Sequence, residues 1–131
     1  MMENKSSGST PQRPDGTRLL DASLVRMDLN QFIDQIKKEE NWLSGDKNSI
    51  TVYKSETLRI VLIGLHKDAE LRKHTAIGTI SVQVLEGKIE FSTEEETIQL
   101  AKGEMIALHK KIPHQVLALE ESLFLLTVAV S

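Results

Sequence analysis

The stretch that decides the fold reads HTAIGTISVQVLEG (residues 74–87) followed by KIEFSTEEETIQLAKGEMIALHKKIPHQVLALEES (residues 88–122). Short runs of β-branched and aliphatic residues alternate here with turn-forming residues at regular spacing. The breaks between runs are Glu86-Gly87, Thr93-Glu94-Glu95, Lys102-Gly103 and Lys111-Ile112-Pro113. No helical pattern of useful length interrupts the runs, so the stretch favours antiparallel strands over parallel βαβ units.

The same alternation of β-forming runs and turn residues begins at Ser49 and continues towards the C-terminus. The predicted strands are Ile50–Lys54, Leu58–Leu65, Thr79–Leu85, Lys88–Ser92, Thr97–Leu100, Met105–His109, Gln115–Leu119 and Leu123–Val130. The second and the last of these are apolar on both faces, and such strands need a layer on each side of the sheet. A helix and a second copy of the chain both fit the outer layer, and we expect a homodimer.

Upstream of the strands the chain divides into two segments. Residues 1–18 carry Ser, Gly, Pro, Asn and Lys with almost no large apolar side chain, which is the composition of a disordered tail. Residues 19–48 form a helical extension, because apolar residues repeat there at helical spacing: Leu29, Phe32, Ile33 and Ile36. The spacing predicts one helix over 28–43 with Asp28 as its N-cap. Residues 49–131 then form the β domain.

Composition excludes several classes of function. The 131 residues suffice for one domain, and the absence of cysteine excludes a disulfide framework and a thiolate zinc site. Acidic and basic residues are interspersed at a net charge of -3, so no nucleic-acid partner is expected. The N-terminus is polar and does not resemble a secretory signal. The longest apolar run, Leu123–Val130, is far shorter than the roughly 20 residues that span a bilayer. We therefore expect no membrane partner and a cytoplasmic location.

The deciding stretch resembles the cupin superfamily, in particular its small single-domain members. The first cupin motif has a His, a second His two residues later, a Glu four residues after that, and a glycine that closes a strand like VLEG. The second motif has a glycine before a strand, a Pro-rich bend and a His. Gly87, Gly103, Pro113 and His114 match these motifs. The resemblance covers most of 50–130 and implies an all-β double-stranded β-helix, a jelly-roll barrel with one open end, preceded by a short N-terminal helix.

The metal-ligand pattern of the family is only half present. That pattern would have a second His at position 76 and a carboxylate at position 80, where this chain has Ala76 and Ile80. His74 and His114 remain of the four expected ligands. Ile80 alternates with Val82 and Val84, so that strand face is aliphatic. The resemblance therefore implies a largely apolar pocket lined by His74, Ile80, Val82 and His114.

Three functions remain open at this point. The first is a small-molecule-binding cupin whose ligand is anchored by His74 and His114, with no cofactor or with a weakly bound divalent metal on those two residues. The second is a metal-dependent cupin enzyme, a dioxygenase or an isomerase, with a reduced ligand set. Its third ligand would be His66, His109 or Glu104. The third is a structural or partner-binding dimer with a vestigial cavity. No catalytic residue is assigned, because the sequence has no phosphate-binding glycine loop, nucleophile elbow or Cys–His pair.

Overall fold

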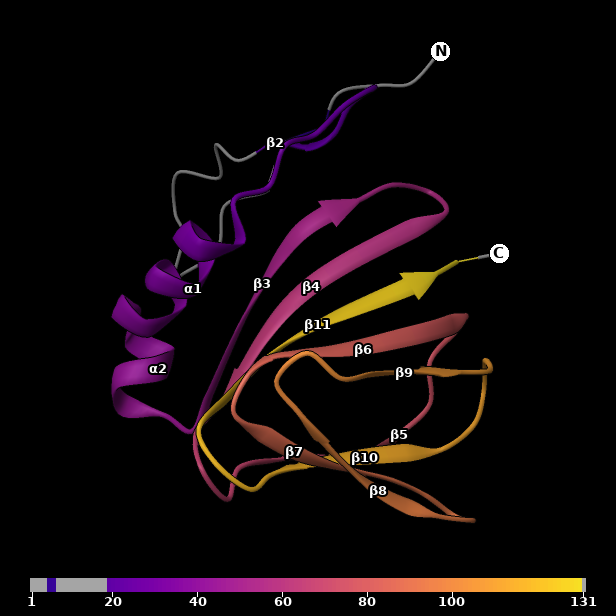
Figure 1. Ribbon diagram of the computed structural model, residues 1–131. Helices are drawn as coiled ribbons and strands as arrows, with labels where there is room; N and C mark the ends of the chain where they lie inside the picture. The colour runs from indigo at the N-terminus through magenta and orange to yellow at the C-terminus, as the bar shows by residue number, and fades with distance from the viewer. Residues whose placement is uncertain (1–4, 7–18, 131) are drawn as a thin grey trace.

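The computed structural model describes residues 5–6 and 19–130, which form two large antiparallel sheets, a small two-stranded sheet and a small helical layer (Figure 1). The sheets contain β3 (Lys47–Lys54), β4 (Leu58–Leu65), β5 (Glu70–His74), β6 (Thr79–Glu86), β7 (Lys88–Thr93), β8 (Thr97–Ala101), β9 (Met105–Leu108), β10 (His114–Ala118) and β11 (Ser122–Ala129). The five-stranded sheet has the order β3-β4-β11-β6-β9, and the four-stranded sheet has the order β5-β10-β7-β8. The prediction of an all-β jelly roll is confirmed.

The strand β5 was absent from the sequence prediction. Its residues, ELRKH, contain a single large apolar side chain, Leu71, and most of the strand is exposed. Because β5 lies at the edge of the four-stranded sheet, its main chain pairs with β10 while its side chains need little apolar character. The predicted tail at 1–18 lies outside the described residues, except that β1 (Lys5–Ser6) pairs with β2 (Leu19–Asp21).

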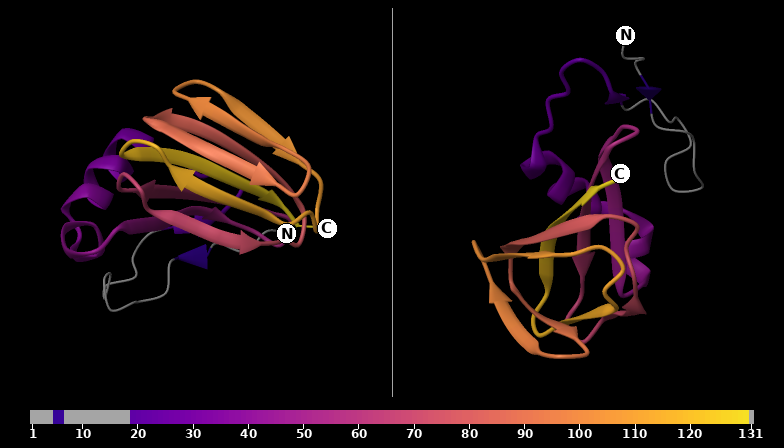
Figure 2. Two further views of the ribbon diagram at one scale, coloured as in Figure 1. Left: turned by 90° about the horizontal axis from the view of Figure 1, so that it is seen from below. Right: turned by 90° about the vertical axis from the view of Figure 1, so that its right-hand side faces the viewer.

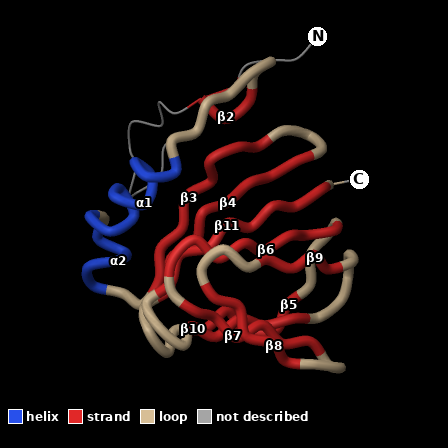
Figure 3. The backbone as a smooth tube through the Cα atoms, in the orientation of Figure 1, coloured by secondary structure: helices blue, strands red, loops and turns tan. Residues whose placement is uncertain are grey.

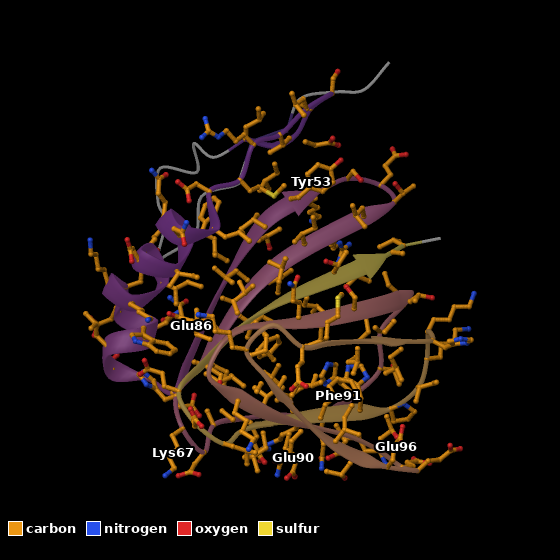
Figure 4. The ribbon with its side chains drawn as sticks, in the orientation of Figure 1. Tyr53, Lys67, Glu86, Glu90, Phe91 and Glu96 are labelled. Carbon is orange, nitrogen blue, oxygen red and sulfur yellow. The ribbon has the colours of Figure 1, made fainter. Side chains whose placement is uncertain are left out.

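The two sheets face each other (Figure 2). A mostly aliphatic core fills the space between them. Ile80, Val82 and Val84 on β6 all point inward and are at most 2% exposed. Phe91 on β7 faces them, whereas its neighbour Glu90 points outward (Figure 4). The period of two that the sequence shows on these strands is therefore the alternation between core and surface.

A helical layer covers part of the outer face of the five-stranded sheet (Figure 3). The predicted single helix is wrong, because two helices form: α1 (Leu29–Lys38) and α2 (Glu40–Ser44). Asp28 does cap α1, since its Oδ1 accepts from the backbone N–H of Asn30 at 3.1 Å. The break occurs at Glu39, whose backbone is extended. The buried Asn48 amide donates to Ile36 O at 3.0 Å and to Glu39 Oε1 at 3.1 Å, so a side chain of β3 stabilises the end of α1.

The helices explain the two strands that are apolar on both faces. Val61 and Ile63 of β4 belong to the interior, while Leu62 lies outside beneath Ile36 and Trp42. Gly64 allows this close approach, because a Cβ at that position would lie 2.9 Å from Cζ3 of Trp42. The outer layer that the sequence required is thus built, at least in part, by the chain itself.

Among the described residues, no helix is long and apolar enough to cross a membrane.

One end of the barrel, which we call the mouth, collects the ends of several strands that are distant in sequence. There β5 ends at His74, β10 begins at His114 and β9 ends at Leu108. The loops 75–78 and 109–113 cross this end, and the backbone N–H of Lys111 joins them by donating to Ala76 O at 3.1 Å.

Two other turns use glycine for its backbone freedom. The turns at Gly87 and Gly103 have φ of 82° and 87°, the left-handed region that glycine adopts without strain.

Candidate functional site

The fold brings His74 and His114 into contact at the mouth. The two residues are register partners on adjacent strands, and their ring centroids are 4.3 Å apart with planes tilted by 60°. Phe91 stacks on the other side of His114 at 5.4 Å between centroids. His74 is exposed, whereas His114 is only 4% exposed. The pairing of β5 with β10 therefore unites two histidines that are 40 residues apart in the chain.

Backbone carbonyls determine which nitrogen of each ring carries a proton. Nδ1 of His114 lies 2.9 Å from Ile112 O, and Nδ1 of His74 lies 2.6 Å from Arg72 O. A carbonyl oxygen only accepts, so both Nδ1 atoms are the protonated ones. Within the described residues, no hydrogen bond reaches Nε2 of either ring. Both Nε2 atoms are consequently available to a ligand.

The environment of His114 favours the neutral imidazole. Burial lowers the pKa of His114 below 6.5, and the nearby His74 lowers this pKa further. The hydrogen bond to Ile112 opposes these effects but does not outweigh them. Near neutral pH His114 therefore presents the lone pair of Nε2, which accepts a hydrogen bond from a ligand.

His114 also lines a cavity of about 190 Å³ beside the mouth. Most of the other lining side chains are polar: Lys73, Ser92, Thr93, Glu94 and Gln115, with Pro113 completing the wall. Lys73 Nζ lies 3.0 Å from Glu94 Oε1 within this lining. Sequence reasoning missed Lys73 and Gln115, although each is adjacent to one of the two histidines and that adjacency was the available signal.

The predicted aliphatic residues occupy a different position. Ile80 and Val82 pack into the interior core and line neither the cavity beside His114 nor a smaller one of about 70 Å³. The smaller cavity lies between the two sheets, at the edge strands β8 and β9. It is lined by Phe91, Thr93, Glu96, Ile98, Ile106, Ala107 and Leu108. The lining around His114 is thus more polar than the apolar pocket that the sequence led us to expect.

The three candidates for a third metal ligand have other contacts. His66 stacks on Trp42 at 3.7 Å, its Nε2 lies 2.9 Å from Trp42 O, and its Nδ1 lies 3.3 Å from Glu121 Oε1. It belongs to the seam between the helices and the barrel. Glu104 Oε1 accepts from the backbone N–H of Ala101 in the turn before β9. His109 is exposed at the start of the 109–113 loop.

The donor set at the mouth does not fit a tightly held catalytic metal. Such a metal usually takes three protein ligands plus a water or substrate. The two free Nε2 atoms supply two, and the described part of the chain contains no group of three or more His, Cys, Asp or Glu residues arranged to hold an ion. A weakly bound divalent ion on the two imidazoles remains compatible with this geometry.

Comparison with known proteins identifies similar structures. No family model matches the chain, and no curated protein does. A conserved protein of unknown function from Streptococcus pyogenes, SPY1581, is 28% identical with a TM-score of 0.67; the match covers 86% of this chain and 91% of that one. An RmlC-like cupin protein from Desulfovibrio desulfuricans is 26% identical with a TM-score of 0.59, over 82% and 90% of the two chains.

An enzyme is also among the similar structures. Salicylate 1,2-dioxygenase from Pseudaminobacter salicylatoxidans is 20% identical with a TM-score of 0.66. The match covers 76% of this chain but only 33% of the dioxygenase. At that identity the likeness concerns the fold alone.

Proposed function

Since this chain is a small cupin-domain protein, we propose that it binds a small molecule at the mouth of its barrel, with His74 and His114 as the polar anchors. The observation that carries the proposal is the pair of contacting imidazoles whose Nδ1 atoms are both engaged by backbone carbonyls. This arrangement holds the two rings and leaves both Nε2 atoms for a ligand. It needs no bound metal.

The cavity beside His114 supports the same proposal. Small-molecule sites are concave and carry a few convergent polar groups. The cavity has a volume of about 190 Å³, and its polar groups come from three strands and a loop. His114 is part of this lining, and its ring is in contact with that of His74.

A metal-dependent enzyme is the second candidate function. The fold neighbours include an enzyme, the dioxygenase, and two imidazoles with free Nε2 atoms are a plausible part of a metal site. The missing third protein ligand argues against tight binding. Metal-free binding therefore fits the donor set better than metal-dependent catalysis.

Metal content and ligand-induced stabilisation together test the proposal. Mass spectrometry of untagged protein should find metal well below one ion per chain, both in the parent and in His74→Gln/His114→Gln. A thermal-shift screen of polar metabolites should give ligands that raise the Tm of the parent, because a ligand that binds only the folded state stabilises it. The double variant should lose these shifts.

Two results would decide against metal-free binding. Near-stoichiometric metal in the parent that is lost in the double variant would favour the enzyme. Shifts that persist unchanged in the double variant would place the ligand elsewhere. Because His114 is buried, circular dichroism must first establish that the variant folds, and the exposed His74→Gln single variant gives the same test at less structural risk.

We also propose that the chain forms a homodimer through the outer face of β6, β9 and β11. The helices cover β3, β4 and the neighbouring ends of β11 and β6, where Leu123 packs with Ile36 and Glu86 pairs with Lys37, and the rest of the sheet lies beyond them (Figure 1). Alternation puts uncharged residues on that remaining face, namely Ser81, Gln83, Met105, Ala107 and Thr127. Met105 is 55% exposed. A second copy of the same uncharged face fits it without burying a charge.

A further inference from the structure

The smaller of the two cavities, which we call the slot, is mostly apolar. It has a volume of about 70 Å³ and lies between the edge strands β8 and β9. Its apolar lining comes from three strands: Phe91, Ile98, Ile106, Ala107 and Leu108. Neither His74 nor His114 lines it. The slot is therefore a candidate site with its own set of residues.

The slot is reachable from solvent because it lies where the barrel wall is incomplete. Phe91 is buried in the core, while Ile98, Ile106 and Leu108 pack against that core and are only partly buried. Strands β8 and β9 are the outermost strands of their sheets, and no described strand pairs with their outer edges. An apolar group that enters between these edges would meet side chains that the fold leaves partly uncovered.

The size of the slot limits the group that it can hold. A dry cavity of about 150 Å³ lined by aliphatic and aromatic side chains binds benzene. The slot has less than half of that volume, which suits a branched group of three or four carbon atoms better than an aromatic ring. Each methylene group buried there should strengthen binding by about fourfold.

The two polar residues of the lining, Thr93 and Glu96, differ in what they can offer a ligand. Oγ1 of Thr93 accepts from the backbone N–H groups of Glu95 and Glu96, both at 3.3 Å, and lies 3.4 Å from Glu96 O. The Glu96 carboxylate has no hydrogen-bond or ion-pair partner within the described residues. Figure 4 shows Glu96 at the end of the barrel near the turn between β7 and β8, with Phe91 between the sheets. The free polar group of the slot is thus a carboxylate.

A carboxylate beside an apolar surface selects a ligand by charge. It attracts an ammonium group and repels a second carboxylate, and nearby apolar side chains strengthen both effects relative to water. The lysines at this end of the barrel do not line the slot: Lys73 pairs with Glu94 at 3.0 Å, and Lys110 and Lys111 lie in the loop after β9.

We propose that the slot binds a small primary amine on a short branched carbon chain, with the chain between Phe91, Ile98 and Leu108 and the ammonium group donating to the Glu96 carboxylate. The inference goes beyond the proposed function, because it uses neither of the two histidines. The apolar chain supplies the affinity, and Glu96 supplies the preference for a cation.

Three probes with the same branched four-carbon body separate these two requirements. Isobutylamine carries a cationic head, isobutanol a neutral one and isobutyrate an anionic one. Protein NMR titrations at pH 7.5 and constant ionic strength should give the tightest binding for isobutylamine and the weakest for isobutyrate. Shifted resonances should include those of Ile98 and Ile106. An order that puts isobutyrate first would overturn the inference.

Glu96→Gln tests the role of the carboxylate. This variant should weaken isobutylamine binding by about threefold to fivefold, the upper range for an exposed ion pair, and should strengthen isobutyrate binding. Glu95→Gln is the matched control, since it removes the same charge from the same exposed turn but does not line the slot. Equal losses of isobutylamine affinity in the two variants would show that only overall charge matters, and the inference would be wrong.

Ile98→Ala tests the place of the carbon chain. Enlarging the slot should reverse the preference between isobutylamine and benzylamine, so that the aromatic amine becomes the tighter ligand. An unchanged preference in the folded variant would put the amine outside the slot and overturn the inference. If Ile98→Ala does not fold, the exposed Glu96→Gln variant still decides the question.

His74→Gln separates the inference from the proposed function. It should leave isobutylamine affinity unchanged, because His74 does not line the slot. Loss of isobutylamine binding in His74→Gln would assign the amine to the histidine pair, so that the slot inference fails while the proposed function stands. Absence of isobutylamine binding at millimolar concentration would also refute the slot, and would leave the test of the histidine pair unaffected.

Discussion

At the residue scale, His114 combines a buried, hydrogen-bonded ring with the ligand-binding role that we propose for it. It is buried against Phe91, anchored at Nδ1 by Ile112 O, and open at Nε2. The sequence singled out this histidine because it follows Pro113 after the strand that Gly103 precedes, as in the second cupin motif. The motif contained no information on protonation, which depends on the burial of the ring and on His74 beside it.

The lowered pKa of His114 predicts a pH-dependent contribution to stability. In the unfolded chain His114 regains its ordinary pKa of 6.5, so the unfolded state binds a proton more readily than the folded state. Stability should therefore fall as the pH drops below about 6.5 towards the lower pKa of the folded state. Urea unfolding at pH 8 and pH 5.5 should show a smaller loss for His114→Gln than for the parent.

The exposed His109 provides the control for this measurement. His109→Gln should keep the pH dependence of the parent, because its ring is exposed and no carboxylate is paired with it among the described residues. An equal pH dependence in the parent and in His114→Gln would contradict the assignment of the effect to His114.

At the scale of elements, the contact between the helices and the sheet is the feature that sequence periodicity described least well. The apolar repeat predicted a helix and its N-cap correctly, but continued it through residue 39. Asn48 on β3 ends α1 by bonding Ile36 O, and no local pattern reports a partner 12 residues away. The two helices then set Ile36 and Trp42 against the outer face of β4.

Gly64 should be necessary for this helix–sheet contact. Gly64→Ala would put a Cβ 2.9 Å from the Trp42 ring and 3.3 Å from Cγ2 of Ile36, so the helices must shift. We expect a loss of about 1–3 kcal/mol in the free energy of unfolding, the usual cost of overpacking. Chemical denaturation of Gly64→Ala, with and without Trp42→Phe, measures this cost.

The smaller ring of Trp42→Phe should relieve part of the clash. The double variant should therefore be more stable than the sum of the two single effects implies. Strict additivity of the two substitutions would show that Gly64 is not limited by Trp42.

At the scale of the whole molecule, the two sheets differ in what covers their outer faces. The helices cover β3, β4 and the adjacent ends of β11 and β6, and the uncharged surface farther along β6, β9 and β11 is left for the proposed second copy. The mouth lies at one end of the barrel and the proposed dimer face on the outside of one sheet, so the proposed ligand binding and dimer formation would use different surfaces.

The dimer is tested by measuring mass in solution. Light scattering after size-exclusion chromatography should give twice the chain mass for the parent and the mass of one chain for Gln83→Lys/Met105→Lys. Burying two lysines on a two-fold face costs desolvation and sets like charges against each other. Gln99→Lys, on the exposed face of β8 in the other sheet, should remain dimeric. A parent that elutes with the mass of one chain would refute the proposed interface.

The sequence by itself determined the fold class and most strands, because these follow from local signals, and it singled out two histidines that the fold brings into contact. Alternation in Ile80–Val84 reports a buried face, and Gly87 and Gly103 report turns with positive φ. The sequence did not predict the strand β5, because an edge strand with exposed side chains lacks that alternation of apolar and polar residues.

Only the tertiary structure decided what surrounds the histidines. Lys73 lines the same cavity as His114 because β5 pairs with β10, and the loops 75–78 and 109–113 meet because the backbone N–H of Lys111 donates to Ala76 O. The same long-range packing sends Ile80 and Val82 into the core, although their alternation alone was equally compatible with a pocket wall. Pairing between segments 40 residues apart depends on strand order, and neither composition nor spacing encodes that order locally.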